Sequence, residues 1–159
     1  QAFRTAFASF IPEVVAAFTD QDRERLMQDA GIVRNKRKID AAITNARAVI
    51  ALRGALAAEV DAHRAGRMGE APLTHLLRPR QSYPRHLAEL AWLYQPSRHP
   101  LPKNAGEVPA QTEESRALSL ELKRRGFVFV GPVTALALMS AIGIVNTDIL
   151  GTWKRPLAE

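Results

Sequence analysis

The 159-residue sequence contains no cysteine, which excludes a disulfide scaffold, a thiol nucleophile and any metal site with cysteine ligands within these residues. Long hydrophobic runs are also missing. The longest, around residues 135–141, is far shorter than the roughly 20 residues that a bilayer span needs. No charged-then-apolar signal sequence opens the chain. We therefore expect no membrane insertion and a cytoplasmic location.

Strand patterns are absent as well. Ten prolines and nine glycines separate stretches in which apolar residues recur every three or four positions, the spacing of a helix face. The sequence therefore predicts an all-α protein that forms a single domain over residues 1–159, a length that can bury a sizeable core. The net charge of +6 favours an anionic partner.

The predicted helices follow one another along the whole chain. Residues 1–10 place Phe3, Phe7 and Phe10 on one helical face, but nothing before them caps that helix, so we expect a longer protein with upstream residues. Further helices are predicted from Pro12, from Thr19 to about Asp29, over residues 39–52 and 87–94, from Thr112 to Gly126, and from Pro132. The last of these is apolar on every face, which predicts a fully buried helix.

A short basic turn joins two of these helices, making a helix-hairpin-helix of about residues 20–52. It leads into a helix N-terminus, where backbone N–H groups lack partners and the helix dipole is positive, so phosphate is its natural ligand. The candidate DNA-binding residues are Gly31, Val33, Arg34, Asn35, Lys36, Arg37 and Lys38. A merely solvated turn is the alternative. A second basic cluster, residues 123–125, ends a helix and is expected to be structural.

Three separated segments make the sequence recognisable. They are residues 26–39 followed by Asn45, residues 3–15, and residues 118–131 continued by Met139 and Asn146. Together they resemble DNA-3-methyladenine glycosylase I, a family of helix-hairpin-helix DNA glycosylases. The resemblance leaves out residues 53–84, which we expect to be an insertion.

The resemblance implies an all-α, monomeric repair enzyme without a redox cofactor. It would flip an alkylated adenine out of double-stranded DNA and hydrolyse its N-glycosidic bond. The implied base pocket is bordered by Phe127, Phe129, Gly131, Leu136 and Ser140. The family's acidic pocket residue lies upstream of Phe3, so the catalytic residue is unknown and the chain as given is not expected to be catalytically complete. A non-catalytic DNA-binding relative and a module that binds an acidic protein are the alternatives.

The remaining candidates are expected to be structural. The family's zinc ligands in the C-terminal tail correspond here to Asp148 and Thr152, and because threonine is a poor zinc ligand we expect no zinc. His63, His75, His86 and His99 share no helix face, which favours surface or capping roles. Asp61 is expected to be solvated, whereas Trp92 and Tyr94 are expected in the core.

Overall fold

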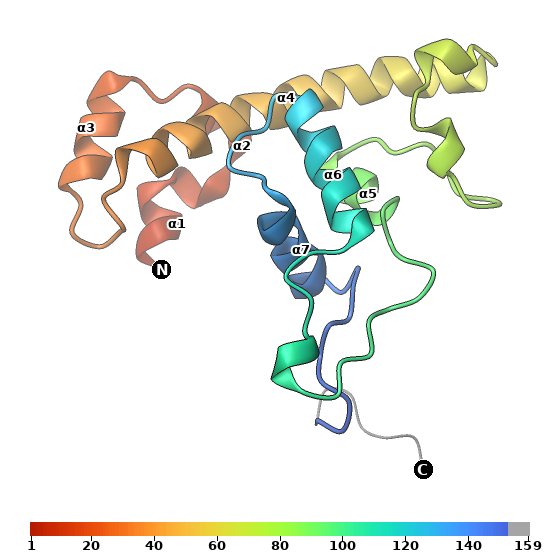
Figure 1. The fold of residues 1–159 in the computed structure, drawn as a ribbon. Coiled ribbons are helices and arrows are strands. Elements are labelled where there is room, and N and C mark those ends of the chain that lie inside the picture. Colours follow the sequence, from red (N-terminus) through yellow and green to blue (C-terminus); the bar gives the residue numbers. More distant parts are fainter. Residues whose placement is uncertain (153–159) are drawn as a thin grey trace.

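The computed structural model describes residues 1–152, and this part of the chain contains helices and turns but no β-strand. Figure 1 shows the longest helix, α4, crossing the molecule, with α1 and α2 beneath one end, α3 beside that end, and α6 and α7 beneath its middle. The all-α prediction is therefore confirmed. The α-helices are α1 (Ala2–Ala6), α2 (Pro12–Ala16), α3 (Asp20–Gln28), α4 (Lys36–Arg64), α5 (Leu87–Trp92), α6 (Glu113–Arg124) and α7 (Pro132–Ala141).

Helix α4 carries two separate hydrophobic cores. Its first half packs with α1–α3 in an N-terminal core that includes Phe7 and Leu26, and its second half packs with α5–α7 around Leu56 and Met139. Length and composition alone would let α4 cross a bilayer, since an 18-residue window has a mean hydropathy of 1.2. Its apolar face is instead covered on both halves by the other helices, as in the core helix of a globular domain.

Helix α4 continues beyond the point where the sequence pattern weakens. The expected boundary at residue 53 is wrong as a helix end, because Leu56 and Ala62 are buried and keep the helix on the core as far as Arg64. The irregular residues that follow add Leu73 and Tyr83 to the same core. Residues 53–84 therefore contribute several buried side chains to the C-terminal core.

Local capping signals place several of the other helix ends. Thr19 and Asp22 form the expected capping box at the start of α3. Thr112 caps α6, and Gly126 adopts a left-handed φ of 87° just beyond its end, where a glycine avoids the strain that a Cβ would cause. These ends were predictable because each depends on a few neighbouring residues.

Two predictions about helices are wrong in detail. Residues 1–10 do not form one helix, because Ala8, Ser9 and Phe10 have positive φ values of 47°, 55° and 60° and turn the chain after α1. Helix α7 is not buried on every face, since Val133 is 60 % exposed. Only one side of α7 packs on the C-terminal core, and hydrophobic composition does not reveal which side that is.

Candidate functional site

The basic turn, residues 31–38 and hereafter the hairpin, is anchored at its start and exposed along its length. Ile32 is buried in the N-terminal core, whereas Val33 is 62 % exposed. A Cβ on Gly31 would lie 3.0 Å from Asp29 Oδ1 and 3.2 Å from Ala2 Cβ, so this position favours glycine for close approach. The hairpin is thus a fixed surface feature.

The hairpin ends in a capped helix N-terminus. Asn35 Oδ1 accepts a hydrogen bond of 3.1 Å from the Lys38 amide, and the preceding amides of the first turn have no carbonyl four residues earlier within the helix. All seven predicted DNA-binding residues lie on this one exposed segment. The geometry therefore offers a positive helix end and several cations to an anion.

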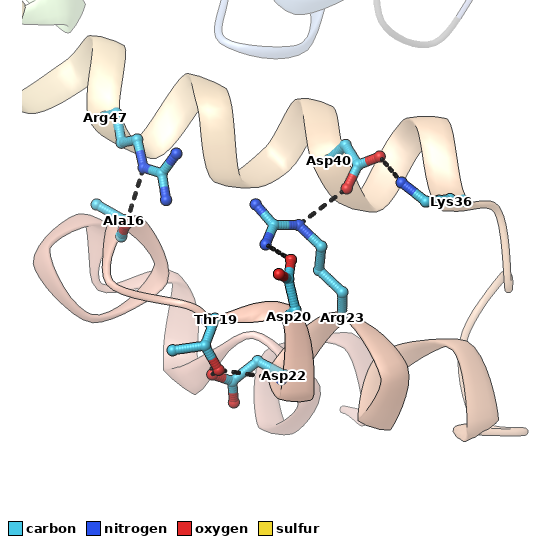
Figure 2. Close-up of polar contacts among 8 residues, drawn as sticks. All are labelled: Ala16, Thr19, Asp20, Asp22, Arg23, Lys36, Asp40 and Arg47. Carbon is cyan, nitrogen blue, oxygen red and sulfur yellow. Dashed lines mark hydrogen bonds and ion pairs between the residues drawn. The ribbon is translucent and has the colours of Figure 1, made fainter.

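One hairpin cation is already neutralised. Lys36 Nζ lies 2.7 Å from Asp40 Oδ2, and Arg23 Nε donates to the other oxygen of Asp40 at 3.0 Å, as Figure 2 shows. The hydrogen bond from Lys36 holds the pKa of Asp40 below its ordinary value. Within residues 1–152, by contrast, Arg34, Arg37 and Lys38 form no ion pair, and these three cations remain available.

The same polar contacts hold the hairpin's two helices together. Arg23 on α3 bridges Asp20 and Asp40, linking α3 to α4 (Figure 2). Arg47 on α4 donates 3.0 Å to the Ala16 carbonyl at the end of α2. Side chains outside the hairpin therefore tie both α2 and α3 to α4.

A groove of about 600 Å³ lies beside the hairpin, between residues of the N-terminal and C-terminal cores. Lys38 and Asn45 are the polar residues on its otherwise apolar wall, and no acidic residue of the described chain lines it. The lining residues are Phe3, Phe7, Phe10, Pro12, Val15, Val33, Lys38, Ile39, Ala42, Asn45, Ala46, Val49, Leu87, Leu122, Phe127, Val130 and Leu138. Its size and apolar character are those of a small-ligand site.

Phenylalanine rings form one wall of this groove. Phe3 and Phe7 stack with ring centroids 6.2 Å apart, and Phe7 stacks on Phe10 at the same distance. Phe10 is 55 % exposed, so part of the wall faces open space. The spacing of these residues was visible in the sequence, but their place in a groove depends on the turn after α1 and on the approach of the C-terminal core.

The predicted base-pocket residues do not share one cavity. Of the five, only Phe127 lines the groove. Leu136 is buried in the C-terminal core, Ser140 pairs with the Thr147 hydroxyl at 3.2 Å, and Phe129 is 53 % exposed. Gly131 is the N-cap of α7. The structure thus brings Phe127 to the groove and leaves Phe129 outside its lining.

The turn of residues 127–131, hereafter the Phe129 turn, is fastened to α4 near the hairpin. Asn45 makes two hydrogen bonds to Val128, accepting from its amide at 2.8 Å and donating to its carbonyl at 3.0 Å. The Arg37 guanidinium lies 5.7 Å from the centre of the Phe129 ring. This role of Asn45 is not visible in local sequence, because its partner is 83 residues away along the chain.

The second basic cluster is structural. Arg125 is buried between Glu59 on α4 and Glu121 on α6, at 3.0 Å and 2.5 Å respectively. Burial by itself raises the pKa of Glu121, but the hydrogen bonds from Arg124 and Arg125 outweigh burial, and the net pKa is lowered. Arg125 therefore joins α4 to the end of α6 through these two carboxylates.

The minor candidates have the local roles expected of them, with one exception. His86 Nδ1 caps α5 by accepting from the Glu89 amide, and Asp61 is exposed. Tyr94 is in the core, but Trp92 is 40 % exposed, contrary to prediction. The other histidines bond nearby groups, namely His63 to Thr74, His75 to the Pro72 carbonyl, and His99 to the Asn146 amide.

The tail positions that correspond to zinc ligands make local hydrogen bonds. The amide of Asp148 donates to Asn146 Oδ1, and the Thr152 hydroxyl donates to the Ile149 carbonyl. Within residues 1–152, no three His, Asp or Glu side chains are grouped so as to hold a metal ion. Because a threonine hydroxyl is a poor zinc ligand, Thr152 does not suit the zinc site that its position implies in the family.

A protein-family model and two similar curated proteins agree on one family. The methyladenine glycosylase family model matches residues 1–85 and 77–155. The chain is 35 % identical over 149 residues to DNA-3-methyladenine glycosylase 1 of Escherichia coli strain K12, and 30 % identical over 152 residues to DNA-3-methyladenine glycosylase of Haemophilus influenzae strain Rd. In both alignments 94 % of this chain spans 66 % of the relative.

The fold is similar to that of a solved relative. A crystal structure of 3-methyladenine DNA glycosylase I superimposes with a TM-score of 0.71 at 31 % identity. The match covers 97 % of this chain and 70 % of that one. About a third of each curated relative therefore has no counterpart in the sequence described here.

Proposed function

Because this chain belongs to the methyladenine glycosylase family, we propose that the protein is a DNA-3-methyladenine glycosylase that acts in base-excision repair. The observation that carries the proposal is an aromatic-walled apolar groove directly beside a basic hairpin, with Lys38 belonging to both. The hairpin would bind the phosphates of double-stranded DNA, and the groove would receive the flipped base.

The groove chemistry suits an alkylated adenine. Methylation at N3 gives the base a positive charge while it is attached to the sugar, and the faces of Phe3 and Phe10 attract a cation. Lys38 would pair with a DNA phosphate at the mouth of the groove and would not oppose the charged base. We propose Phe127 as the part of the predicted base pocket that touches this ligand.

The reaction needs little acid or base assistance. The electron pair of the bond between the base nitrogen N9 and the sugar carbon C1′ moves to the base, which leaves as neutral 3-methyladenine. Water adds its oxygen to C1′ and gives up a proton, so an abasic site remains in the DNA. Since the leaving base is already cationic, orientation and binding supply much of the rate. The protein is proposed to do this as a cytoplasmic monomer.

The direct test is release of 3-methyladenine from methylated duplex DNA by the purified full-length protein, with any residues upstream of Gln1 included, followed by chromatography of the freed base. We expect release, and we expect Phe10→Ala to reduce it more than Leu120→Ala, which removes a comparably exposed side chain outside the groove. No release at micromolar protein would refute the proposal.

A non-catalytic DNA-binding relative is the second candidate. The observation that favours it is the lack of an acidic residue on the groove wall within residues 1–152. Such a protein would bind duplex DNA with strong salt dependence but would free no base. The release assay and a binding titration on the same sample separate the two candidates.

A further inference from the structure

We propose that Phe129 is a nucleobase-stacking residue at the rim of the groove, and that Asn45 is the positioning residue that holds it there. This inference rests on the proposed function, because the ligand is a base of the DNA strand bound by the hairpin. The Phe129 ring does not line the groove, but Asn45 and Val130, which flank and hold its turn, do. The proposed stacking site therefore lies next to the groove and is separate from it.

The backbone on either side of Phe129 is tied down. Asn45 bonds both polar atoms of the Val128 peptide, and the buried Ser119 hydroxyl donates 2.5 Å to the Val130 carbonyl. Phe129 itself has a φ of 57°, a left-handed conformation that a bulky residue rarely adopts. Two long-range anchors therefore maintain a strained turn whose apex is an aromatic ring.

The ring at this apex is half exposed and lies beside a cation. Phe129 is 53 % exposed, and its ring packs against Arg37 of the hairpin. A half-exposed aromatic ring costs hydrophobic free energy unless a ligand covers it. An aromatic ring and a guanidinium beside a phosphate-binding surface are the elements of a stacking site for a nucleobase, and the surrounding positive charge matches a nucleic-acid strand.

The position of Phe129 beside the groove suggests which base it would stack on. When a base enters the groove, its place in the duplex is left empty, and its neighbours lose a stacking partner. A ring at the groove rim, beside the phosphate contacts, is placed to stack on such an exposed base. Phe129 would then favour the flipped arrangement, while Asn45 would act only through Phe129.

The test uses a duplex with a tetrahydrofuran abasic analogue opposite 2-aminopurine, whose fluorescence reports stacking. We expect Phe129→Ala to weaken binding to this duplex about 5- to 150-fold, the range for loss of one base–aromatic stack, and to abolish the fluorescence change at saturation. Phe129→Trp should retain both properties, whereas Phe129→Leu should lose the fluorescence change. Leu101→Ala, which truncates another exposed side chain, should behave as wild type.

Asn45 is tested by a double-mutant cycle. Asn45→Ala should also weaken binding and diminish the fluorescence change, and the double variant with Phe129→Ala should be no weaker than Phe129→Ala alone. Additive losses would overturn the positioning role. Wild-type fluorescence and affinity in Phe129→Ala would overturn the stacking site, while wild-type protein that binds no duplex at all would instead refute the proposed function.

Discussion

The ion pairing of the hairpin predicts which of its two lysines contributes to the salt dependence of DNA binding. Lys36 and Lys38 are the same residue type two positions apart, but only Lys36 is paired, at 2.7 Å from Asp40. Each cation that neutralises a phosphate adds about 0.9 to the slope of log affinity against log salt. Lys38→Ala should therefore flatten the slope by about 0.9, and Lys36→Ala should flatten it by clearly less.

The magnitude follows from the three cations without an ion-pair partner in the described chain, Arg34, Arg37 and Lys38. Three phosphate contacts give a slope of about −2.7, so raising salt from about 50 to 200 mM should weaken wild-type binding about 40-fold. For Lys38→Ala the same rise in salt should weaken DNA binding by a factor about 3.5 times smaller than for the wild type.

The assay is fluorescence anisotropy with a short duplex, titrated at four salt concentrations. Arg64→Ala is the control, because Arg64 lies on the same helix about 39 Å from Lys38 by helical rise and should leave the slope unchanged. Equal slope changes for Lys36→Ala and Lys38→Ala would refute the reasoning that Asp40 withdraws Lys36 from DNA. Slopes unaffected by any hairpin variant would refute the hairpin as the DNA contact.

Three further predictions concern the fold. Gly31→Ala should destabilise the protein by about 1–3 kcal/mol in urea unfolding, because its Cβ would meet Ala2 at 3.2 Å; an unchanged midpoint would contradict this. Leu56→Ala should cost about 2–5 kcal/mol if residues beyond 53 belong to the core, whereas an appended insertion would lose much less. Since the folded-state pKa of Glu121 is lowered, its pairing with Arg125 stabilises the fold above the unfolded pKa and is lost as pH falls below it. Glu121→Gln should therefore show a smaller drop in melting temperature between pH 6 and 3 than wild type, and equal drops would exclude this contribution.

Features encoded by neighbouring residues were accessible from the sequence. The Thr19 capping box, the Gly126 helix stop and the exposed hairpin each depend on residues within a few positions of one another, and local sequence specifies such structures directly. The prediction failed where tertiary contacts extend or break a local pattern, as when burial of Leu56 carries α4 past residue 53. The exposed side of α7 was missed for the same reason.

By itself, the sequence determined an all-α chain with a basic hairpin and a family resemblance, because helical period, caps and charge runs are properties of short segments. Only the tertiary structure decided what surrounds the hairpin. It placed Phe3, Phe10 and Phe127 in one groove, paired Arg23 of α3 with Asp40 of α4, and set Phe129 against Arg37 through the distant Asn45. These arrangements depend on how two cores pack along one helix, and no short segment of sequence encodes that packing.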